Sequence, residues 1–189
     1  MSGFFKNLFS GISFGKQMDM VSIVFFLKER RTIDLSIIEN ACDSAFRNKF
    51  LPKNETNFVV DGSKETERTD EIDKILIKSV IPENSGLFLI TIGNGKYSQT
   101  PPSKIVLDNT LIGNKGDIEH NQYILFDLIG EIGSKADAFR FIGKVGSFLS
   151  KELNPGIIYL PNLSRFYSVN ESTLEKLNSR YVIDELLKN

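Results

Sequence analysis

The chain contains 189 residues, of which 41% are hydrophobic and 25% charged, a composition typical of an ordinary soluble globular protein rather than a fibrous or disordered one. Its 23 basic and 24 acidic residues nearly cancel, so no overall field attracts nucleic acid or an anionic membrane, and we expect neither as a partner. The single cysteine, Cys42, excludes an internal disulfide and a multi-cysteine zinc site, which fits a reducing compartment, and we expect a cytoplasmic protein.

Residues 1–18 form an N-terminal extension, and residues 19–189 are expected to form a single domain. The chain has no apolar run of ~18 residues and no unbroken apolar stretch of a signal peptide near its start, so we expect no integral membrane association. If the extension is helical, it carries an apolar stripe, which we expect to pack on its own domain or on a partner protein rather than on a bilayer. The stripe consists of Phe5, Leu8, Phe9 and Ile12, with Phe4 beside it, and its candidate partner-binding residues are Phe4, Phe5, Leu8 and Phe9.

Residues 21–27, VSIVFFL, are β-branched and aromatic, and this composition predicts a strand. A helix is expected to follow, with Asp34 as its N-cap and with Ile33 and Ile38 as a hydrophobic staple across that cap. Pro52 disfavours helical geometry at the residue before it, so the helix should end near residues 50 and 51.

Residues 74–81, KILIKSVI, are compatible with two structures. Acidic residues just before them suit the first turn of a helix, whereas their β-branched content and the PENSG turn that follows favour a β-hairpin. We favour the hairpin. Further strands are predicted at residues 57–60, 87–92, 104–107 and 123–129.

A second long helix is expected to begin at Ser134, where the sequence SKAD has the form of a capping box with Asp137. Phe141 and Phe148 fall outside its main apolar face, which indicates that the helix is covered on more than one side. The cover is either the C-terminal segment or a second copy of the protein, so a homo-oligomer is one alternative. The small residues that interrupt the helix are Gly143, Gly146, Ser147 and Ser150.

The C-terminal region begins with a predicted strand at residues 156–161, GIIYLP. A capping box from Ser168 to Glu171 then introduces an amphipathic helical stretch. The order of elements, with strand and helix units at both ends and antiparallel strands between them, predicts the α+β class. We expect a mainly antiparallel sheet with two long helices and a C-terminal helix packed on it.

Residues 89–102, LITIGNGKYSQTPP, resemble the start of a phosphate-binding loop because a strand-like run leads into Gly95 and Lys96. A Walker A loop also needs a glycine where Ile90 stands, a hydroxyl where Tyr97 stands, and a helix after the loop. The Asn-Gly pair matches a type I′ turn instead, in which both central residues have positive φ. We therefore interpret Lys96 as a solvated charge and expect no nucleotide or other cofactor.

Residues 108–119, DNTLIGNKGDIE, imitate a calcium loop, with Asp, Gly and Glu at its first, sixth and twelfth positions. Ile112 stands where an oxygen ligand is needed, Lys115 adds a positive charge, and the flanking segments have the pattern of strands rather than helices. We interpret this segment as a surface connection between strands and expect no metal site.

His120 is the only histidine, which excludes two-histidine zinc sites and leaves one residue for any Ser-His-Asp triad. Because its neighbours Glu119 and Asn121 place it at a strand entrance, we interpret it as an exposed or hydrogen-bonded histidine. Cys42 lies on the apolar face of the first helix and is interpreted as a buried structural thiol. No residue is assigned a catalytic role.

The loop after residue 60 concentrates acidic side chains, and most such runs are simply solvated. The functional alternative is that this loop docks a basic surface of a partner protein, which would change the association rate and salt dependence more than the affinity. The candidate partner-binding residues of the loop are Glu65, Glu67, Asp70 and Glu71.

Three features of the chain resemble uncharacterised bacterial α+β domains of unknown function. They are the opening GFFKNLFSG, the VSIVFFL strand with its helix, and the later helix that leads into GIIYLP. The resemblance spans most of the chain as an arrangement of elements, and it implies no catalytic residues. Small bacterial proteins of this type include immunity proteins for secreted toxins, which sets an expectation about function.

The leading hypothesis is a non-enzymatic interaction domain, such as an immunity or accessory protein, that binds another protein. The alternative is a small-ligand-binding protein or an enzyme whose site is assembled from dispersed polar residues. A deep polar pocket that joins several of these residues would favour the alternative, whereas a flat surface would favour partner binding. The dispersed candidates are Lys96, His120, Asp127, Arg165 and Tyr167.

Overall fold

The computed structural model describes residues 19–46, 59–60, 72–80, 86–97, 106–111, 118–130 and 134–188. The strands in these residues are β1 (Asp19–Leu27), β2 (Val59–Val60), β3 (Ile72–Val80), β4 (Gly86–Asn94), β5 (Val106–Leu107), β6 (Thr110–Leu111), β7 (Gln122–Gly130), β8 (Ile157–Leu160) and β9 (Arg165–Ser168). The helices are α2 (Leu35–Phe46), α3 (Lys135–Leu153), α4 (Glu171–Leu177) and α5 (Val182–Leu187), together with a short 3₁₀ helix, η2 (Pro161–Leu163).

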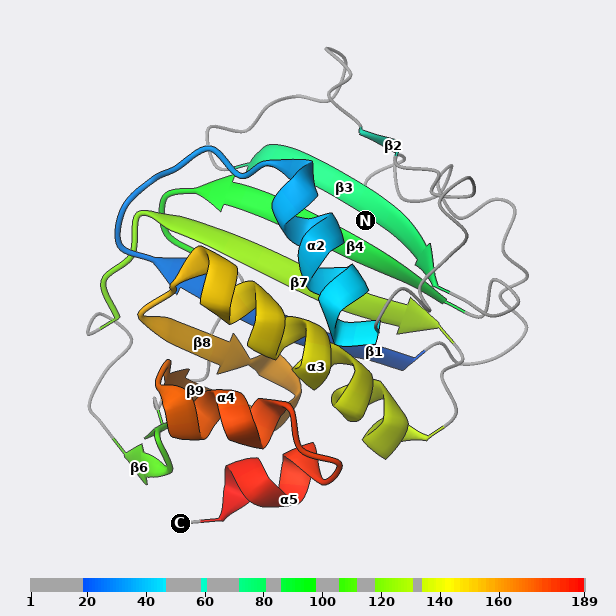
Figure 1. Ribbon diagram of the computed structural model, residues 1–189. Helices are drawn as coiled ribbons and strands as arrows, with labels where there is room; N and C mark the ends of the chain where they lie inside the picture. Colours follow the sequence, from blue (N-terminus) through cyan, green and yellow to red (C-terminus); the bar gives the residue numbers. More distant parts are fainter. Residues whose placement is uncertain are drawn as a thin grey trace.

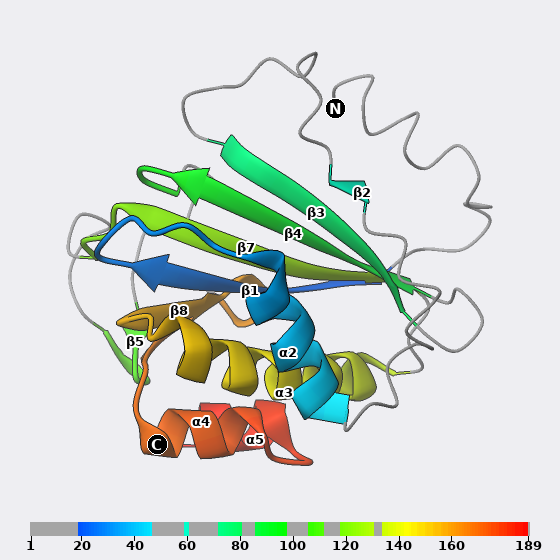
Figure 2. The same cartoon turned by 45° about the horizontal axis from the view of Figure 1, so that its top comes forward.

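The described strands form one nine-stranded sheet in the order β2-β3-β4-β7-β1-β8-β9-β5-β6, so β1 lies at its centre. Neighbouring strands are antiparallel except β5 and β9, which are parallel. Helices α2 and α3 lie over the same face of the sheet, and α4 and α5 lie beside α3 (Figures 1 and 2). The predicted α+β class, with a mainly antiparallel sheet and helices packed on it, is confirmed.

Residues 74–80 of the ambiguous segment belong to a strand that pairs with the next one, as favoured from its composition, and Ile81 lies outside the described residues. Strand β3 pairs antiparallel with β4, and the register runs from Ile72 opposite Gly93 to Val80 opposite Gly86. The β-branched side chains suit a strand with neighbours on both sides, which outweighs the helix-favouring acids before it. The PENSG turn itself lies outside the described residues.

Side chains of the central strand alternate between two apolar clusters, because successive residues of a strand point to opposite faces of the sheet. Ile23 and Phe25 of β1 belong to the core beneath the helices, together with Ile124 and Phe126 of β7. The opposite face carries a second cluster, which we call the far-side cluster. Its buried members are Val24, Phe26, Tyr97, Ile118, Tyr123, Leu125, Tyr159 and Phe166.

Both long helices begin as their sequences predict. The Asp34 carboxylate accepts a hydrogen bond from the Ser36 N–H at 3.1 Å, which caps α2. At the start of α3, the Ser134 hydroxyl accepts from the Asp137 N–H, and the Asp137 carboxylate accepts from the Ser134 N–H, so the capping box is complete. No described helix is long and apolar enough to cross a membrane. The predicted end of the first helix near residues 50 and 51 lies outside the described residues.

The small residues of α3 let other elements approach its backbone closely. A Cβ atom at Gly143 would lie 2.4 Å from the carbonyl oxygen of Leu177 in α4, and a Cβ atom at Gly146 would lie 2.8 Å from Cδ1 of Ile23 in β1. The Ser147 hydroxyl donates to the Leu174 carbonyl at 3.1 Å. The C-terminal segment therefore covers α3 on the side away from α2, which is one of the two covers predicted for this helix.

The C-terminal helical stretch differs from its prediction in two ways. First, the N-cap is Asn170 rather than Ser168, since Ser168 still belongs to β9 while the Asn170 carboxamide oxygen accepts from the Thr173 N–H at 2.9 Å. Second, the stretch forms two short helices instead of one, because the chain turns between the end of α4 at Leu177 and the start of α5 at Val182.

The Asn-Gly pair after β4 is not a type I′ hairpin turn. Gly95 has φ of 100°, but Asn94 is still the last residue of β4 and does not have positive φ. Two central residues with positive φ, as a type I′ turn requires, occur instead at Asp108 (48°) and Asn109 (63°), which connect β5 to β6. The start of the predicted surface connection at residues 108–119 is therefore a tight hairpin.

Candidate functional site

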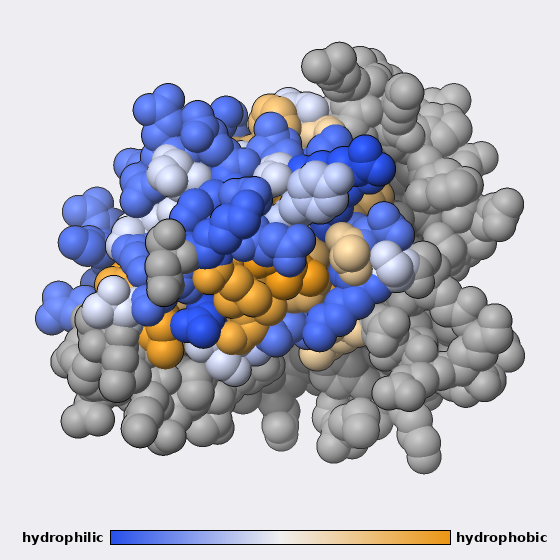
Figure 3. Space-filling model, turned by 90° about the horizontal axis from the view of Figure 1, so that it is seen from below, coloured by the Kyte–Doolittle hydropathy of each residue, from blue (hydrophilic) through white to orange (hydrophobic). Residues whose placement is uncertain are grey.

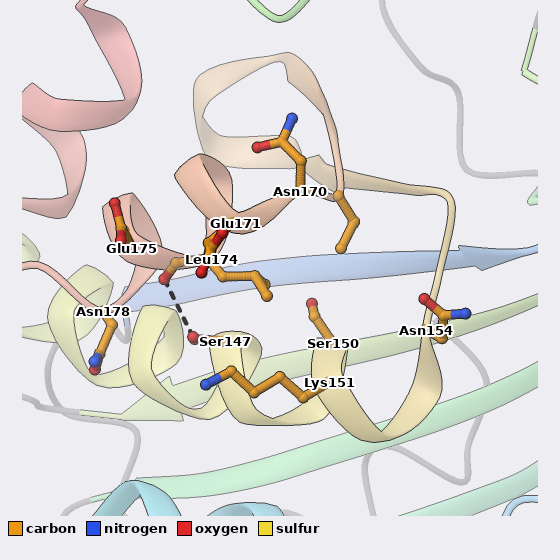
Figure 4. A pocket seen from close by; sticks show the side chains of 10 residues that line it. Ser147, Ser150, Lys151, Asn154, Asn170, Glu171, Leu174, Glu175 and Asn178 are labelled. Atoms are coloured by element: carbon orange, nitrogen blue, oxygen red, sulfur yellow. Dashed lines mark hydrogen bonds between the residues drawn. The ribbon is translucent and has the colours of Figure 1, made fainter.

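The candidate site is a cleft of about 490 Å³ between the last turns of α3 and the helix α4. Its side chains come from both elements and from the bend between β9 and α4 (Figure 4). We call it the α3–α4 cleft. It is lined by Ser147, Ser150, Lys151, Asn154, Val169, Asn170, Glu171, Leu174, Glu175 and Asn178.

Local sequence explains why the two helices leave this space. Helix α3 ends at Asn154, which adopts the left-handed conformation with φ of 45°, and its N–H donates to the Ser150 carbonyl at 2.9 Å. The chain then returns through β8 and β9, and Asn170 starts α4 across from the end of α3. Because Ser147 and Ser150 have short side chains, they do not fill the gap between the helices.

The two serine hydroxyls of the cleft have different environments. Ser147 donates its hydroxyl proton to the Leu174 carbonyl at 3.1 Å. Ser150 is 2% exposed, and its hydroxyl oxygen has no hydrogen-bond partner in the part of the chain that the structure describes. The Ser150 hydroxyl points toward the space between α3 and α4, where the Leu174 side chain approaches it (Figure 4). A buried hydroxyl without a partner costs about 1–3 kcal/mol, so this oxygen is available to an incoming hydrogen-bond donor.

The charges of the cleft are unevenly placed. Glu171 and Glu175 are exposed on one side of α4, one helical turn apart. Lys151 is the single cation of the lining, and its Nζ lies 5.4 Å from the ring centre of Phe148, outside ion-pair distance of either carboxylate. Among the described residues, neither carboxylate has an ion-pair or hydrogen-bond partner. The cleft therefore carries a net negative charge.

The five dispersed candidates fall into two groups on opposite faces of the sheet. His120 and Asp127, with Lys96 near His120, belong to the far side, and Arg165 and Tyr167 belong to the side of the helices. None of them lines the α3–α4 cleft. Asp127 alternates along β7 in step with Tyr123 and Leu125 of the far-side cluster, so it lies on the far side of the sheet. His120 contacts Phe26 of the same cluster, with ring centres 4.4 Å apart. Tyr167 belongs to the core beneath the helices, and Arg165, two positions earlier in β9, is on the same face of the sheet. A pocket that joins several of these residues would favour the alternative hypothesis, and the α3–α4 cleft is not such a pocket.

His120 has both ring nitrogens engaged in the fold. Its Nε2 accepts from the Tyr97 N–H at 2.9 Å, and its Nδ1 lies 3.1 Å from the Ile118 carbonyl, to which it donates in the matching neutral tautomer. Burial lowers the pKa of His120, the Ile118 carbonyl partly offsets this, and the positive charge of Lys96 lowers it again. Of the two sequence-based interpretations, the hydrogen-bonded histidine is correct.

Asp127 is buried on the far side, 6% exposed, and accepts a hydrogen bond of 2.5 Å from the Ser22 hydroxyl. Burial raises its pKa to about 6, although the Ser22 bond lowers it in part. Burial and then the negative charge of Asp127 raise the pKa of Tyr97 well above its ordinary range. The Asp127 carboxylate and the Ser22 hydroxyl therefore satisfy each other inside the protein, as buried polar groups with a structural role do.

Tyr167 and the Asp108–Asn109 turn both hold the C-terminal helix. The Tyr167 hydroxyl donates to the Leu186 carbonyl at 3.1 Å, and burial raises the pKa of this phenol to about 12. The Asn109 amide donates to the Leu186 and Lys188 carbonyls at 3.1 and 2.9 Å. Since these bonds satisfy carbonyls at the end of α5, Tyr167 has a structural role there, and its predicted ligand-binding role stays a prediction.

The eight predicted partner-binding residues lie outside the described residues, so those interpretations remain predictions. They are Phe4, Phe5, Leu8, Phe9, Glu65, Glu67, Asp70 and Glu71. In the part of the chain that the structure describes, no group of three or more His, Cys, Asp or Glu side chains could hold a metal ion.

Sequence reasoning identified Ser147 and Ser150 as small residues of the second helix, but it did not identify the cleft. The signal was present in part, because small residues on a second side of a helix indicate a close neighbour. Which neighbour it is depends on residues 169–178, some twenty positions away. Comparisons with protein-family models, with curated proteins and with solved structures give no match for this chain.

Proposed function

We propose that this protein is a non-enzymatic interaction domain that binds another protein at the α3–α4 cleft. The observation that carries the proposal is the buried Ser150 hydroxyl, which faces a cleft with two carboxylates. Within the described part of the chain, neither this hydroxyl nor these carboxylates have a partner. Buried polar groups are normally hydrogen-bonded, and an exception of this kind is explained when a bound group supplies the missing bond.

The composition of the cleft favours a protein partner over a small molecule. Small-molecule sites are lined mainly by apolar and aromatic side chains. Only Val169 and Leu174 are apolar among the ten residues that line this cleft, and none is aromatic. A polar lining of this kind suits a side chain or loop of another protein surface, where hydrogen bonds accompany apolar contacts nearby.

Exposed apolar side chains are present in the C-terminal segment that follows the cleft residues. Tyr181 is 61% exposed, three positions after the cleft residue Asn178, and the Arg180 guanidinium lies 5.9 Å from its ring centre. Leu187 of α5 is 43% exposed. The face that carries α5 shows an apolar area bordered by hydrophilic residues (Figure 3). Tyrosine and arginine are enriched among the residues that dominate binding energy in protein interfaces.

The same proposal includes the process and the compartment that the sequence suggests. The protein acts in the cytoplasm as an accessory protein, and immunity toward a secreted toxin is one such role. The single cysteine and the near-neutral charge support a reducing compartment and a partner other than nucleic acid. A toxin gene beside the gene for this protein would support the immunity role, and its absence would count against that role.

An alternative small-ligand function is favoured by one observation. A carboxylic acid with a pKa of about 6, as at Asp127, is suited to proton transfer near neutral pH. Against this, the Asp127 carboxylate already accepts the Ser22 hydroxyl bond, and His120 has no free ring nitrogen. We therefore rank this function second.

The test is affinity capture from native cells with three forms of the full-length protein. Glu175→Trp places a bulky side chain at the edge of the cleft, whereas Glu152→Trp changes an equally exposed glutamate of α3 that does not line it. We expect one stoichiometric protein partner with the wild type and with Glu152→Trp, and its loss with Glu175→Trp. A partner captured equally by all three forms, or a bound metabolite and no protein, would contradict the proposal.

A further inference from the structure

The chemistry of the α3–α4 cleft indicates which group of a partner it binds. Glu171 and Glu175 share one side of α4 because residues four apart lie one turn apart on a helix. Both are exposed, and within the described residues neither has an ionic partner. The cleft therefore presents two carboxylates whose charges are not neutralised inside the protein.

The Ser150 hydroxyl supplies a second, independent indication. It is 2% exposed, has no hydrogen-bond partner among the described residues, and points from α3 into the cleft (Figure 4). The half-buried Leu174 side chain lies beside it. Ser150 lies in the last turn of a 19-residue helix, where the backbone dipole favours a cation.

Resting on the proposed function, we infer that the cleft binds an arginine side chain of the partner protein. Its guanidinium carries five N–H donors in a fixed plane and no acceptor. These donors can bond to acceptors at separate positions, whereas the three donors of an ammonium group radiate from one point. The Lys151 ammonium does not occupy this role, since it lies against Phe148.

An anion is the opposite alternative, because Lys151 and the first turn of α4 also border the cleft. Helix α4 has only seven residues, and its first turn already contains the carboxylate of Glu171. Two carboxylates repel a phosphate group, so the local charges favour a cation.

The inference is tested with short peptides on the full-length ¹⁵N-labelled protein, followed by NMR chemical shifts. The probes are acetyl-Gly-Arg-Gly-amide, the same peptide with lysine, the same peptide with citrulline, and inorganic phosphate. Citrulline has nearly the shape of arginine but no charge. We expect saturable shifts around Ser150, Glu171 and Glu175 with the arginine peptide and no such shifts with phosphate. The citrulline peptide should bind about tenfold more weakly, since each exposed charge pair contributes modestly.

Variants locate the binding groups. The double change of Glu171→Gln and Glu175→Gln should lower the affinity for the arginine peptide by about tenfold, and Ser150→Ala should lower it by about threefold. Glu152→Gln, outside the cleft, should leave the affinity unchanged. The glutamates are exposed, so these variants keep the wild-type spectrum elsewhere.

Two sets of outcomes separate this inference from the proposed function. Absence of saturable shifts with the arginine peptide up to its solubility limit, equal binding of the citrulline peptide, or shifts with phosphate would overturn the arginine inference. If the partner is nevertheless captured and lost with Glu175→Trp, the proposed function stands without it. If no partner is captured although the arginine peptide binds as expected, the proposed function fails by itself.

Discussion

Replacement of Gly143 by alanine tests the contact between α3 and the C-terminal helices, because this contact sets how closely α4 approaches α3. The new Cβ atom would lie 2.4 Å from the Leu177 carbonyl oxygen and 3.2 Å from the nearest methyl group of Val182. A backbone carbonyl at the end of α4 cannot rotate away as a side chain can. The helices must therefore move apart.

The loss of stability in Gly143→Ala is the balance of two opposing effects. Overpacking costs about 1–3 kcal/mol, and contact with a backbone atom places this case in the upper part of that range. Alanine has a higher helix propensity than glycine by about 1 kcal/mol, which offsets part of the cost. We therefore expect Gly143→Ala to lower the free energy of unfolding by about 1–2 kcal/mol, or the melting temperature by roughly 2–8 °C.

Gly146→Ala is the matched control. It makes the same change three positions away in the same helix, but the atom that it meets, at 2.8 Å, is Cδ1 of the Ile23 side chain. That methyl group can shift, so the control should change the free energy of unfolding by less than about 1 kcal/mol. Urea unfolding followed by circular dichroism measures both variants. A Gly143→Ala protein as stable as the wild type would refute the packing of α4 on α3 at this point.

Three further predictions concern other parts of the fold. Because burial raises the pKa of Asp127 to about 6 from 3.8, the folded protein holds an extra proton between these values and loses stability as pH rises through them. The free energy of unfolding of Asp127→Asn should therefore match that of the wild type near pH 4 and exceed it by roughly 2–3 kcal/mol at neutral pH. The same difference in unfolding free energy at both pH values would contradict this prediction. Asn109→Gly should tolerate the positive φ but lose both amide bonds to the end of α5, which should speed hydrogen exchange in α5; unchanged exchange would show that these bonds are unimportant. Gly95→Val should destabilise the protein by about 1 kcal/mol or more through its φ of 100°, whereas Lys96→Ala should leave stability and function nearly unchanged; loss of function in folded Lys96→Ala would revive a phosphate site.

The secondary structure was largely predictable because its signals are local. β-Branched and aromatic runs gave β1 and β7, and the capping boxes and N-caps depend on residues within one helical turn, as at Ser134. The break between α4 and α5 was missed because its leucines continue the helical spacing through residues 174–187. The turn after Leu177 places Val182 against Gly143, and this tertiary contact is not visible in local spacing.

The position of candidate side chains depended on strand pairing, which local patterns do not determine. Arg165 and Tyr167 lie on the same face of β9 because they are two positions apart. Which side of the sheet that face is on depends on the pairing of Tyr167 with Ile158, a residue of the core beneath the helices. Asp127 faces the other way because it pairs with Ser22. The cleft was not predictable for the same reason, since it joins the end of α3 to α4 across two intervening strands.

The most direct test of the proposed binding site is site-specific photo-crosslinking in native cells. A benzophenone side chain replaces Asn178, which lines the α3–α4 cleft, or Glu152, which is exposed on α3 outside it. We predict one crosslinked product with a different protein from position 178 and none from position 152. A crosslink only from position 152, or only to a second copy of this chain, would contradict partner binding at the cleft.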